Sequence, residues 1–96
     1  MQYNIVLAPE AIEDLNGLKA NARAEVKDAI QKYLRNEPAK SSKSRIKRLR
    51  GFRRPQYRLR VQNVRVFYDV VDDTVEVLAI VEKLAASEWL ERHGAR

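Results

Sequence analysis

The chain has 96 residues, which is enough for one domain over residues 1–96 and too few for a second core. Its 45% hydrophobic and 33% charged residues exclude a disordered chain, and the absence of cysteine excludes a disulfide scaffold and a cysteine nucleophile. The net charge of +6 is unevenly distributed along the chain, and this distribution bears on function.

The first 38 residues predict one strand followed by two helices. Residues 2–8 (QYNIVLA) form a short apolar run typical of a strand. Pro9 suits the first turn of a helix that continues to Leu18. Asn21 can cap a second helix, whose apolar positions recur at helical spacing as far as Leu34. Pro38 ends this region, and the economical arrangement is an antiparallel helix hairpin.

The rest of the chain predicts a meander of strands and a last helix. A short edge strand is expected around residues 46–49, and alternation of period two continues over 57–62, 64–70 and 75–81. Gln62-Asn63 and Asp72-Asp73 read as tight turns, and residues 85–92 as a short helix. The side chains expected to face the helix hairpin are Tyr57, Leu59, Val61, Val64, Val66, Tyr68, Val70, Val75, Val77, Ala79 and Val81. Leu78 and Ile80 are expected on the opposite side.

This order predicts an α+β fold. We expect a mostly antiparallel four-stranded sheet, an N-terminal helix hairpin on one face and a short C-terminal helix. The other face of the sheet is expected to be open and to carry arginines.

Most of the positive charge lies between residues 38 and 68. This segment holds eight arginines and three lysines and contains no Asp or Glu. Such a block repels itself unless an anion lies against it, and arginine is suited to bidentate contact with phosphate. The obvious anions are the backbone of a nucleic acid, an acidic protein or an acidic membrane surface. If the anion is RNA, the residues expected to bind it are Lys40, Lys43, Arg45, Lys47, Arg48, Arg50, Arg53 and Arg54.

The remaining arginines of the segment predict a phosphate site. If Gln62-Asn63 is a two-residue turn, Arg60 lies directly opposite Arg65, and Arg58 lies on the same face, opposite Phe67. Like charges directly opposite destabilise a strand pair, and a bound anion would remove the conflict. The alternative is that the long side chains splay into water. Phe67 could stack a base here or be covered by the last helix or a partner.

Cleavage of RNA needs neither a metal nor a protein nucleophile, because the 2′-hydroxyl of the substrate can attack the adjacent phosphate. Arginines can neutralise the charge that develops on the phosphate, and a separate group must move protons. Glu82 and Lys83, at the end of the last strand, are the candidates for proton transfer. A polar strand end without catalytic function is the alternative.

An ordered set of motifs resembles the RelE/ParE superfamily of bacterial toxins over nearly the whole chain. The set comprises the first strand, two helices, Arg48-Leu49-Arg50-Gly51, Tyr57-Arg58-Leu59-Arg60 and Val64-Arg65-Val66-Phe67-Tyr68. RelE-like members imply a ribosome-dependent, metal-independent endonuclease that cuts messenger RNA by 2′-hydroxyl attack, uses no cofactor and is neutralised by a cognate antitoxin.

The resemblance also suggests roles for individual residues. It matches Arg65 to the arginine that contacts the scissile phosphate, and Arg58 and Arg60 to two basic residues of the preceding strand. Lys83 is the nearest equivalent of a basic residue that follows the last strand. A C-terminal tyrosine found in some relatives is missing, since Trp89-Leu90 occupies that region.

Two other functions stay open at this stage. ParE-like members poison DNA gyrase and do not cut RNA, and a plain nucleic-acid-binding module would do neither. Both toxin hypotheses imply a toxin–antitoxin hetero-oligomer in the cytoplasm, with ribosome and mRNA as further partners in the first. The apolar residues expected to dock the antitoxin are Phe67, Leu78, Ile80, Trp89 and Leu90.

Overall fold

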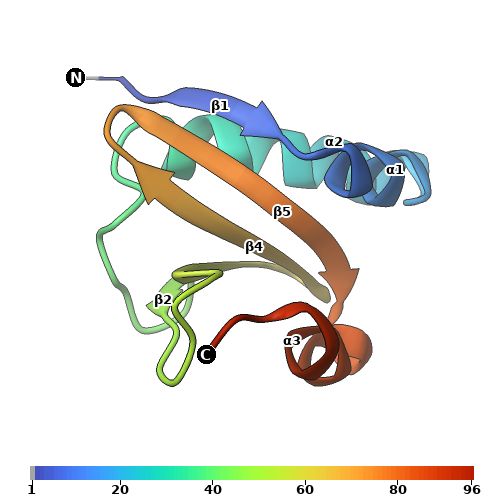
Figure 1. The fold of residues 1–96 in the computed structure, drawn as a ribbon. Coiled ribbons are helices and arrows are strands. Elements are labelled where there is room, and N and C mark those ends of the chain that lie inside the picture. The colour runs from blue at the N-terminus through green and yellow to red at the C-terminus, as the bar shows by residue number, and fades with distance from the viewer. Residues whose placement is uncertain (1) are drawn as a thin grey trace.

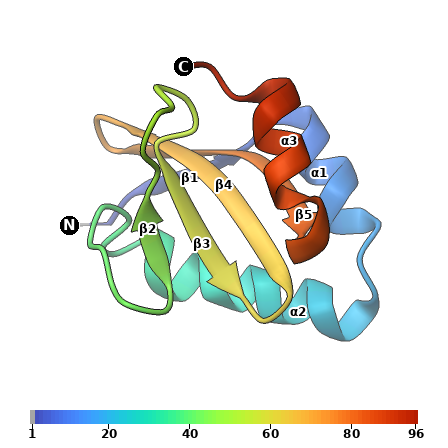
Figure 2. The ribbon, with the colours of Figure 1, turned by 90° about the horizontal axis from the view of Figure 1, so that it is seen from below.

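Residues 2–96, which the computed structural model describes, form one sheet with helices on both of its faces (Figure 1, Figure 2). The strands are β1 (Asn4–Leu7), β2 (Ile46–Arg48), β3 (Tyr57–Val61), β4 (Val64–Val71) and β5 (Thr74–Glu82). The helices are α1 (Pro9–Asn16), α2 (Ala20–Ala29) and α3 (Ala86–His93). A π-helical segment, η1 (Ile30–Leu34), continues α2, and a 3₁₀ turn, η2 (Lys83–Ala85), precedes α3.

The sheet confirms the predicted α+β class and has one strand more than predicted. The strand order is β1-β5-β4-β3-β2. β1 pairs with β5 in parallel, from Asn4 opposite Thr74 to Leu7 opposite Val77, and the other pairs are antiparallel. The fifth strand arises because the short segments at both edges, β1 and β2, pair with the three-stranded meander.

The helix hairpin begins as predicted at Pro9, the first residue of α1. The second helix starts earlier than predicted, because Lys19 and not Asn21 is its N-terminal cap residue, without a capping side-chain hydrogen bond. The side chain of Arg23 closes the turn between the helices, since its Nη2 donates to the Leu18 carbonyl oxygen at 2.9 Å. This bond satisfies a backbone acceptor that the end of α1 leaves free.

The core lies between the hairpin and one face of the sheet, which we call the hairpin face. Leu15, Val26 and Leu34 pack there against the inward side chains of the strands. Tyr68 is fully buried in this core, and its hydroxyl donates to the Pro38 carbonyl oxygen at 2.6 Å. This bond ties the end of the hairpin to the middle of β4.

The alternation of side chains along β5 between the two faces of the sheet shifts by one residue at a β-bulge. Phe67 pairs with Ala79 and Tyr68 with Val77, so Leu78 is the extra residue. Beyond it, Ile80 points into the core at 3% exposure, whereas Ala79 and Val81 pair with Phe67 and Arg65. The predictions that Ala79 and Val81 face the hairpin and that Ile80 faces away were therefore wrong, because strict alternation does not anticipate a bulge.

The opposite face of the sheet, which we call the arginine face, is partly covered by α3. The ring of Trp89 stacks on Phe67 with a centroid distance of 5.0 Å and an angle of 7°, and Phe67 is 1% exposed. Of the environments predicted for Phe67, cover by the last helix is the one observed. The segment after α3 forms an isolated β-bridge between Ala95 and Arg54, which fixes the helix in place.

Candidate functional site

The turn between β3 and β4 brings three arginines together on the arginine face. Val61 pairs with Val64, and Arg60 pairs with Arg65, as the two-residue turn predicts. Arg58 pairs with Phe67 on the same face. The left-handed residue of the turn is Gln62, with φ 55°. Among residues 2–96, Arg58, Arg60 and Arg65 form no ion pair with a carboxylate.

Arg65 is held rigidly within this cluster. It is 7% exposed, and its Nη1 donates to the Gln62 carbonyl oxygen at 2.9 Å and to the Val64 carbonyl oxygen at 3.1 Å. Burial lowers the pKa of Arg65, and the positive charges of Arg58 and Arg60 lower it further. A guanidinium fixed by its own turn, with no carboxylate beside it, is arranged to receive an anion.

Arg58 carries the clearest sign of a missing partner. Its Nε is buried and has no hydrogen-bond partner among residues 2–96. Burial lowers the pKa of Arg58, and the charge of Arg60 adds to this effect. A buried donor without an acceptor costs about 1–3 kcal/mol, and a phosphate oxygen would recover that energy once the side chain turns Nε toward it.

A basic cleft of about 460 Å³ adjoins Arg58. Its lining residues are Lys47, Arg48, Leu49, Arg50 and Arg58. Lys47 pairs with Arg58 across β2 and β3, so the cleft continues the arginine cluster toward the β2 edge. The cluster and the cleft form one surface of positive charge that suits the backbone of a nucleic acid.

The two proton-transfer candidates lie differently. Lys83 follows β5 directly, and its backbone N–H donates to the Asn63 carbonyl oxygen at 2.7 Å, which places it beside the β3–β4 turn. Glu82 pairs with Val64, a residue of the core, so alternation places its side chain on the hairpin face. The structure therefore brings the backbone of Lys83 to the β3–β4 turn next to the arginine cluster, whereas the strand alternation does not place Glu82 on the arginine face.

The residues expected to bind RNA differ in how exposed they are and in what they contact. Those that lie exposed are Lys40, Lys43, Lys47, Arg48, Arg50, Arg53 and Arg54. Arg48 and Arg45 lie over the rings of Tyr57 and Tyr33 at 5.1 and 4.3 Å, on the hairpin side of β2. Stacked guanidinium groups keep their edge donors free for an anion.

Arg54 differs from the other basic residues. Its Nη2 lies 2.8 Å from Glu76 Oε1, and its Nε lies 3.4 Å from Asp69 Oδ2. Arg53 likewise donates from Nε to the carbonyl oxygen of Arg96 at 2.7 Å. These two arginines hold parts of the protein together, which sequence spacing did not indicate.

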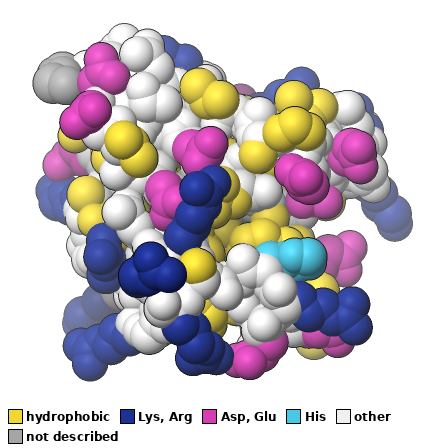
Figure 3. All heavy atoms as spheres, viewed as in Figure 1, with side chains coloured by type: hydrophobic (Ala, Val, Ile, Leu, Met, Phe, Trp, Pro, Cys, Tyr) yellow, Lys and Arg dark blue, Asp and Glu magenta, His cyan; other side chains and the backbone are white. Residues whose placement is uncertain are grey.

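The expected docking surface is only partly exposed. Ile80 and Phe67 are buried, so the prediction that they dock a partner does not hold for this conformation. Leu90 is half-buried, and Leu78 and Trp89 line a cleft of about 510 Å³ between α1, β5 and α3. Figure 3 shows hydrophobic side chains exposed beside the single histidine, His93, which also lines this cleft.

The same cleft contains acidic residues that sequence reasoning missed. Glu10, Glu13 and Asp14 of α1 line it opposite Trp89. Their spacing of three and four residues is a signal that could have revealed a common helix face. Residues 2–96 contain no group of three or more His, Cys, Asp or Glu that could hold a metal ion. They also contain no helix long and apolar enough to cross a membrane.

Comparison with known sequence families shows which family this chain belongs to. The family described as "ParE toxin of type II toxin-antitoxin system, parDE" matches residues 5–83. The chain belongs to this toxin family. It is a type II toxin of the RelE/ParE superfamily, as the sequence motifs predicted. No curated protein sequence matches the toxin.

Solved structures of other toxins share its fold. RelBE2 of Mycobacterium tuberculosis has a TM-score of 0.73 at 24% identity, covering 85% of this toxin and 99% of that chain. The RelB-RelE antitoxin-toxin complex of Methanococcus jannaschii gives 0.68 at 23% identity, with 88% and 96% covered. A mutant of E. coli toxin RelE in the free state gives 0.69 at 21% identity, with 97% and 99% covered.

Proposed function

We propose that this toxin is a ribosome-dependent endonuclease that cuts messenger RNA without a metal. The observation that carries the proposal is the arginine cluster, in which Arg65 is fixed and Arg58 has a buried donor without a partner. The scissile phosphate of RNA supplies the anion that this cluster lacks. The 23–24% identity to RelE-type chains supports a shared fold, and the arginines supply the argument for chemistry.

In the proposed reaction the 2′-oxygen attacks the adjacent phosphorus while the bond from phosphorus to the 5′-oxygen breaks. The products are a 2′,3′-cyclic phosphate and a 5′-hydroxyl. Arg65 neutralises charge on the phosphate oxygens, and Arg58 and Arg60 hold the RNA backbone. The 2′-hydroxyl proton must leave and the 5′-oxygen must gain one, and Lys83 is the nearest candidate for one of these transfers.

The partner we propose is a cognate antitoxin in a hetero-oligomer, in the compartment that holds the ribosomes. Leu78, Trp89 and Leu90 are the expected docking residues that keep exposed surface. The M. jannaschii and M. tuberculosis structures are toxin–antitoxin complexes, which supports the same assembly here. Acidic side chains of an antitoxin would also be attracted to the basic cleft.

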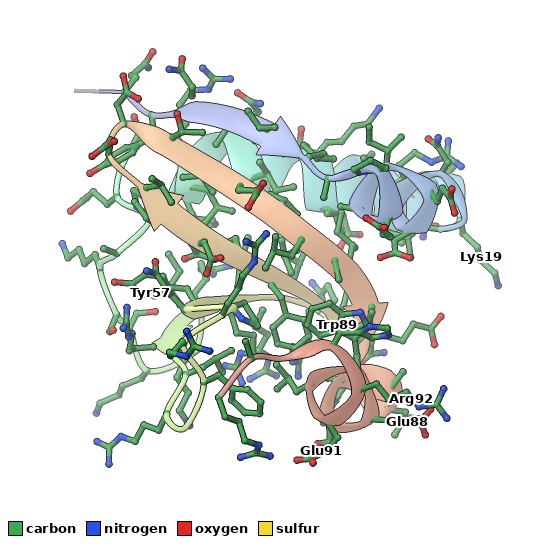
Figure 4. The ribbon with its side chains drawn as sticks, viewed as in Figure 1. Lys19, Tyr57, Glu88, Trp89, Glu91 and Arg92 are labelled. Atoms are coloured by element: carbon green, nitrogen blue, oxygen red, sulfur yellow. The ribbon has the colours of Figure 1, made fainter. Side chains whose placement is uncertain are left out.

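The test is cleavage of messenger RNA on programmed ribosomes, mapped by primer extension. Arg65→Ala is expected to lower cleavage about 100-fold, the usual effect of removing one donor to a developing oxyanion. Arg92→Ala is the matched control, because Arg92 lies beside Glu88 on α3 at 3.6 Å and both side chains are exposed (Figure 4). Equal cleavage by the Arg65 and Arg92 variants would contradict the assignment.

Inhibition of DNA gyrase is the second candidate function. Two observations favour it: the family match carries the ParE description, and Glu82 does not reach the arginine face. A supercoiling assay with purified toxin tests this function. Inhibition of supercoiling together with uncut messenger RNA would replace the nuclease by the gyrase inhibitor. If both assays were negative for the folded, antitoxin-free protein, a plain nucleic-acid-binding module would remain.

A further inference from the structure

A second basic cavity lies on the other side of β2 from the arginine cluster. It has a volume of about 200 Å³ and lies between η1, the loop of residues 35–45 and the start of β2. Figure 2 shows this loop passing from the end of the hairpin to the β2 edge. Its lining includes Lys32, Tyr33, Glu37, Lys40, Ser42 and Arg45.

Two cations of this cavity are gathered by one aromatic ring. The guanidinium of Arg45 lies 4.3 Å from the centroid of the Tyr33 ring, and Lys32 Nζ lies 5.3 Å from it. Among residues 2–96, neither side chain forms an ion pair. The ring therefore contacts two positive charges that both line the cavity, while their hydrogen-bond donors stay available.

The one carboxylate of the cavity neutralises little of this charge. Glu37 lies 3.5 Å from Lys40, and both side chains are exposed, at 65% and 72%. An ion pair this exposed is weak because water screens it. Three cations thus face one solvated carboxylate, and an anion would enter a site of net positive charge.

Ser42 adds an oriented hydroxyl. Its Oγ accepts the backbone N–H of Arg45 at 3.0 Å and that of Ile46 at 3.2 Å. With both lone pairs of the oxygen engaged, the hydroxyl hydrogen is left to donate to a further acceptor. The same two bonds fix the loop, so the hydroxyl and the Arg45 backbone keep a constant position.

The helix beside the cavity has unusual winding. Residues 30–34 are π-helical, and Lys32 and Tyr33 belong to this segment. π-Helical turns are rare and are found frequently at functional sites, since their wider winding carries a cost that a function can justify. This is a second observation, independent of the charges, that singles out the same place.

From these features we propose that the cavity binds a phosphate group through Lys32, Arg45 and the hydroxyl of Ser42. The volume suits a phosphate with an attached sugar and is small for a whole nucleotide in a typical ligand pocket. The phosphate can belong to a nucleic-acid backbone or to a free phosphate ester. The inference does not depend on the proposed nuclease function, because binding here requires no cleavage.

The experiment follows the backbone amide resonances of the ¹⁵N-labelled full chain. The titrants are inorganic phosphate, pyrophosphate and a tetranucleotide with hydroxyl groups at both ends, so that all of its phosphates are internal. We expect the backbone amide resonances of Ser42 and Arg45 to shift when a titrant that binds in the cavity is added. Saturation by inorganic phosphate or pyrophosphate alone identifies a free phosphate ester, and saturation by the tetranucleotide alone identifies a nucleic-acid backbone.

Variants assign the binding to this cavity. Lys32→Gln and Arg45→Gln are each expected to weaken binding about tenfold, the loss of one charge-assisted hydrogen bond. Lys19→Gln is the matched control, because Lys19 is exposed at the turn of the hairpin and points away from the loop (Figure 4). Lys32 is exposed, so its variant should fold even if Arg45→Gln does not. Shifts confined to Arg58 and its neighbours, or equal affinity of Lys32→Gln and Lys19→Gln, would overturn the proposal.

Discussion

Two groups of arginines lie at or beside the arginine face of the sheet, and they differ in whether carboxylates lie next to them. Arg54 contacts the carboxylates of Asp69 and Glu76. Arg58 and Arg65 lie at the other end of the face with burial, mutual repulsion and no carboxylate among residues 2–96. The comparison teaches that charge density alone does not mark a binding residue. What separates the groups is whether the protein itself supplies the counter-charge.

The carboxylate beside Arg54 also has a defined structural task. Asp69 Oδ1 accepts the backbone N–H of Gln56 at 2.7 Å, and the side-chain oxygen of Gln56 accepts the N–H of Val70 at 2.9 Å. Arg54 therefore completes a polar network that joins the loop before β3 to β4. Arg65 donates only to the backbone carbonyl oxygens of Gln62 and Val64, and Arg58 Nε has no partner among residues 2–96, so neither charge is neutralised and both are available for an anion.

The largest effect on stability is expected where the network is broken. Arg54→Ala leaves the buried carboxylate of Asp69 without its cation, and we expect a loss of about 1–3 kcal/mol in the free energy of unfolding. Urea denaturation followed by circular dichroism measures this loss. An unchanged unfolding free energy would mean that Arg54 belongs with the uncompensated arginines.

A gain in the free energy of unfolding is expected from a substitution at the other end of the arginine face. Arg58→Met keeps the length of the side chain but removes a buried donor without a partner and one of three neighbouring positive charges. We expect the free protein to gain about 1 kcal/mol in unfolding free energy, as when buried charges are replaced by apolar groups. The same denaturation experiment applies. A loss of stability would show that the cluster is compensated within the protein, and the comparison would fail.

A smaller, pH-dependent effect is expected from Asp69. Burial raises the pKa of Asp69, although the hydrogen bond from Gln56 and the charge of Arg54 act in the other direction. A raised folded-state pKa means that the stability contributed by this group is complete below the ordinary pKa and is lost as pH rises through the folded-state value. Relative to Asp69→Asn, the wild-type melting temperature should therefore fall as pH rises above the ordinary aspartate pKa of about 4.

Thermal melts of both proteins across this pH range measure the difference. If the wild-type protein instead gained stability relative to Asp69→Asn as pH rises, the attraction of Arg54 would outweigh the cost of burial. The pairing at this end of the face would then be stronger than the geometry indicates.

The fold was predictable where local chemistry determines it. The turn at Gln62-Asn63 set the register of Arg60 and Arg65 correctly, because a two-residue connection leaves one pairing. The burial of Ile80 was not predictable from the sequence. It follows from the bulge at Leu78, which depends on how β5 meets β4 and on the Ile80 N–H, which donates to Asp14 Oδ2 at 3.0 Å. That bond joins residues far apart in sequence.

The site was predictable in part for the same reason. The arginine cluster follows from strand alternation, so Arg58, Arg60 and Arg65 could be placed together from sequence. The engagement of Arg54 could not, because Asp69 and Glu76 reach it only through the fold. Likewise, the side of the sheet on which Glu82 lies depends on the phase change within β5.

The parallel pairing of β1 with β5 has a consequence for the order in which the chain can fold. Asn4 and Thr74 are 70 residues apart, so this edge of the sheet can close only after synthesis has passed β5. The hairpin that carries Arg60 and Arg65 closes over two residues and can form early. During translation, the arginine pair is therefore expected to assemble before the sheet that supports it has its final edge.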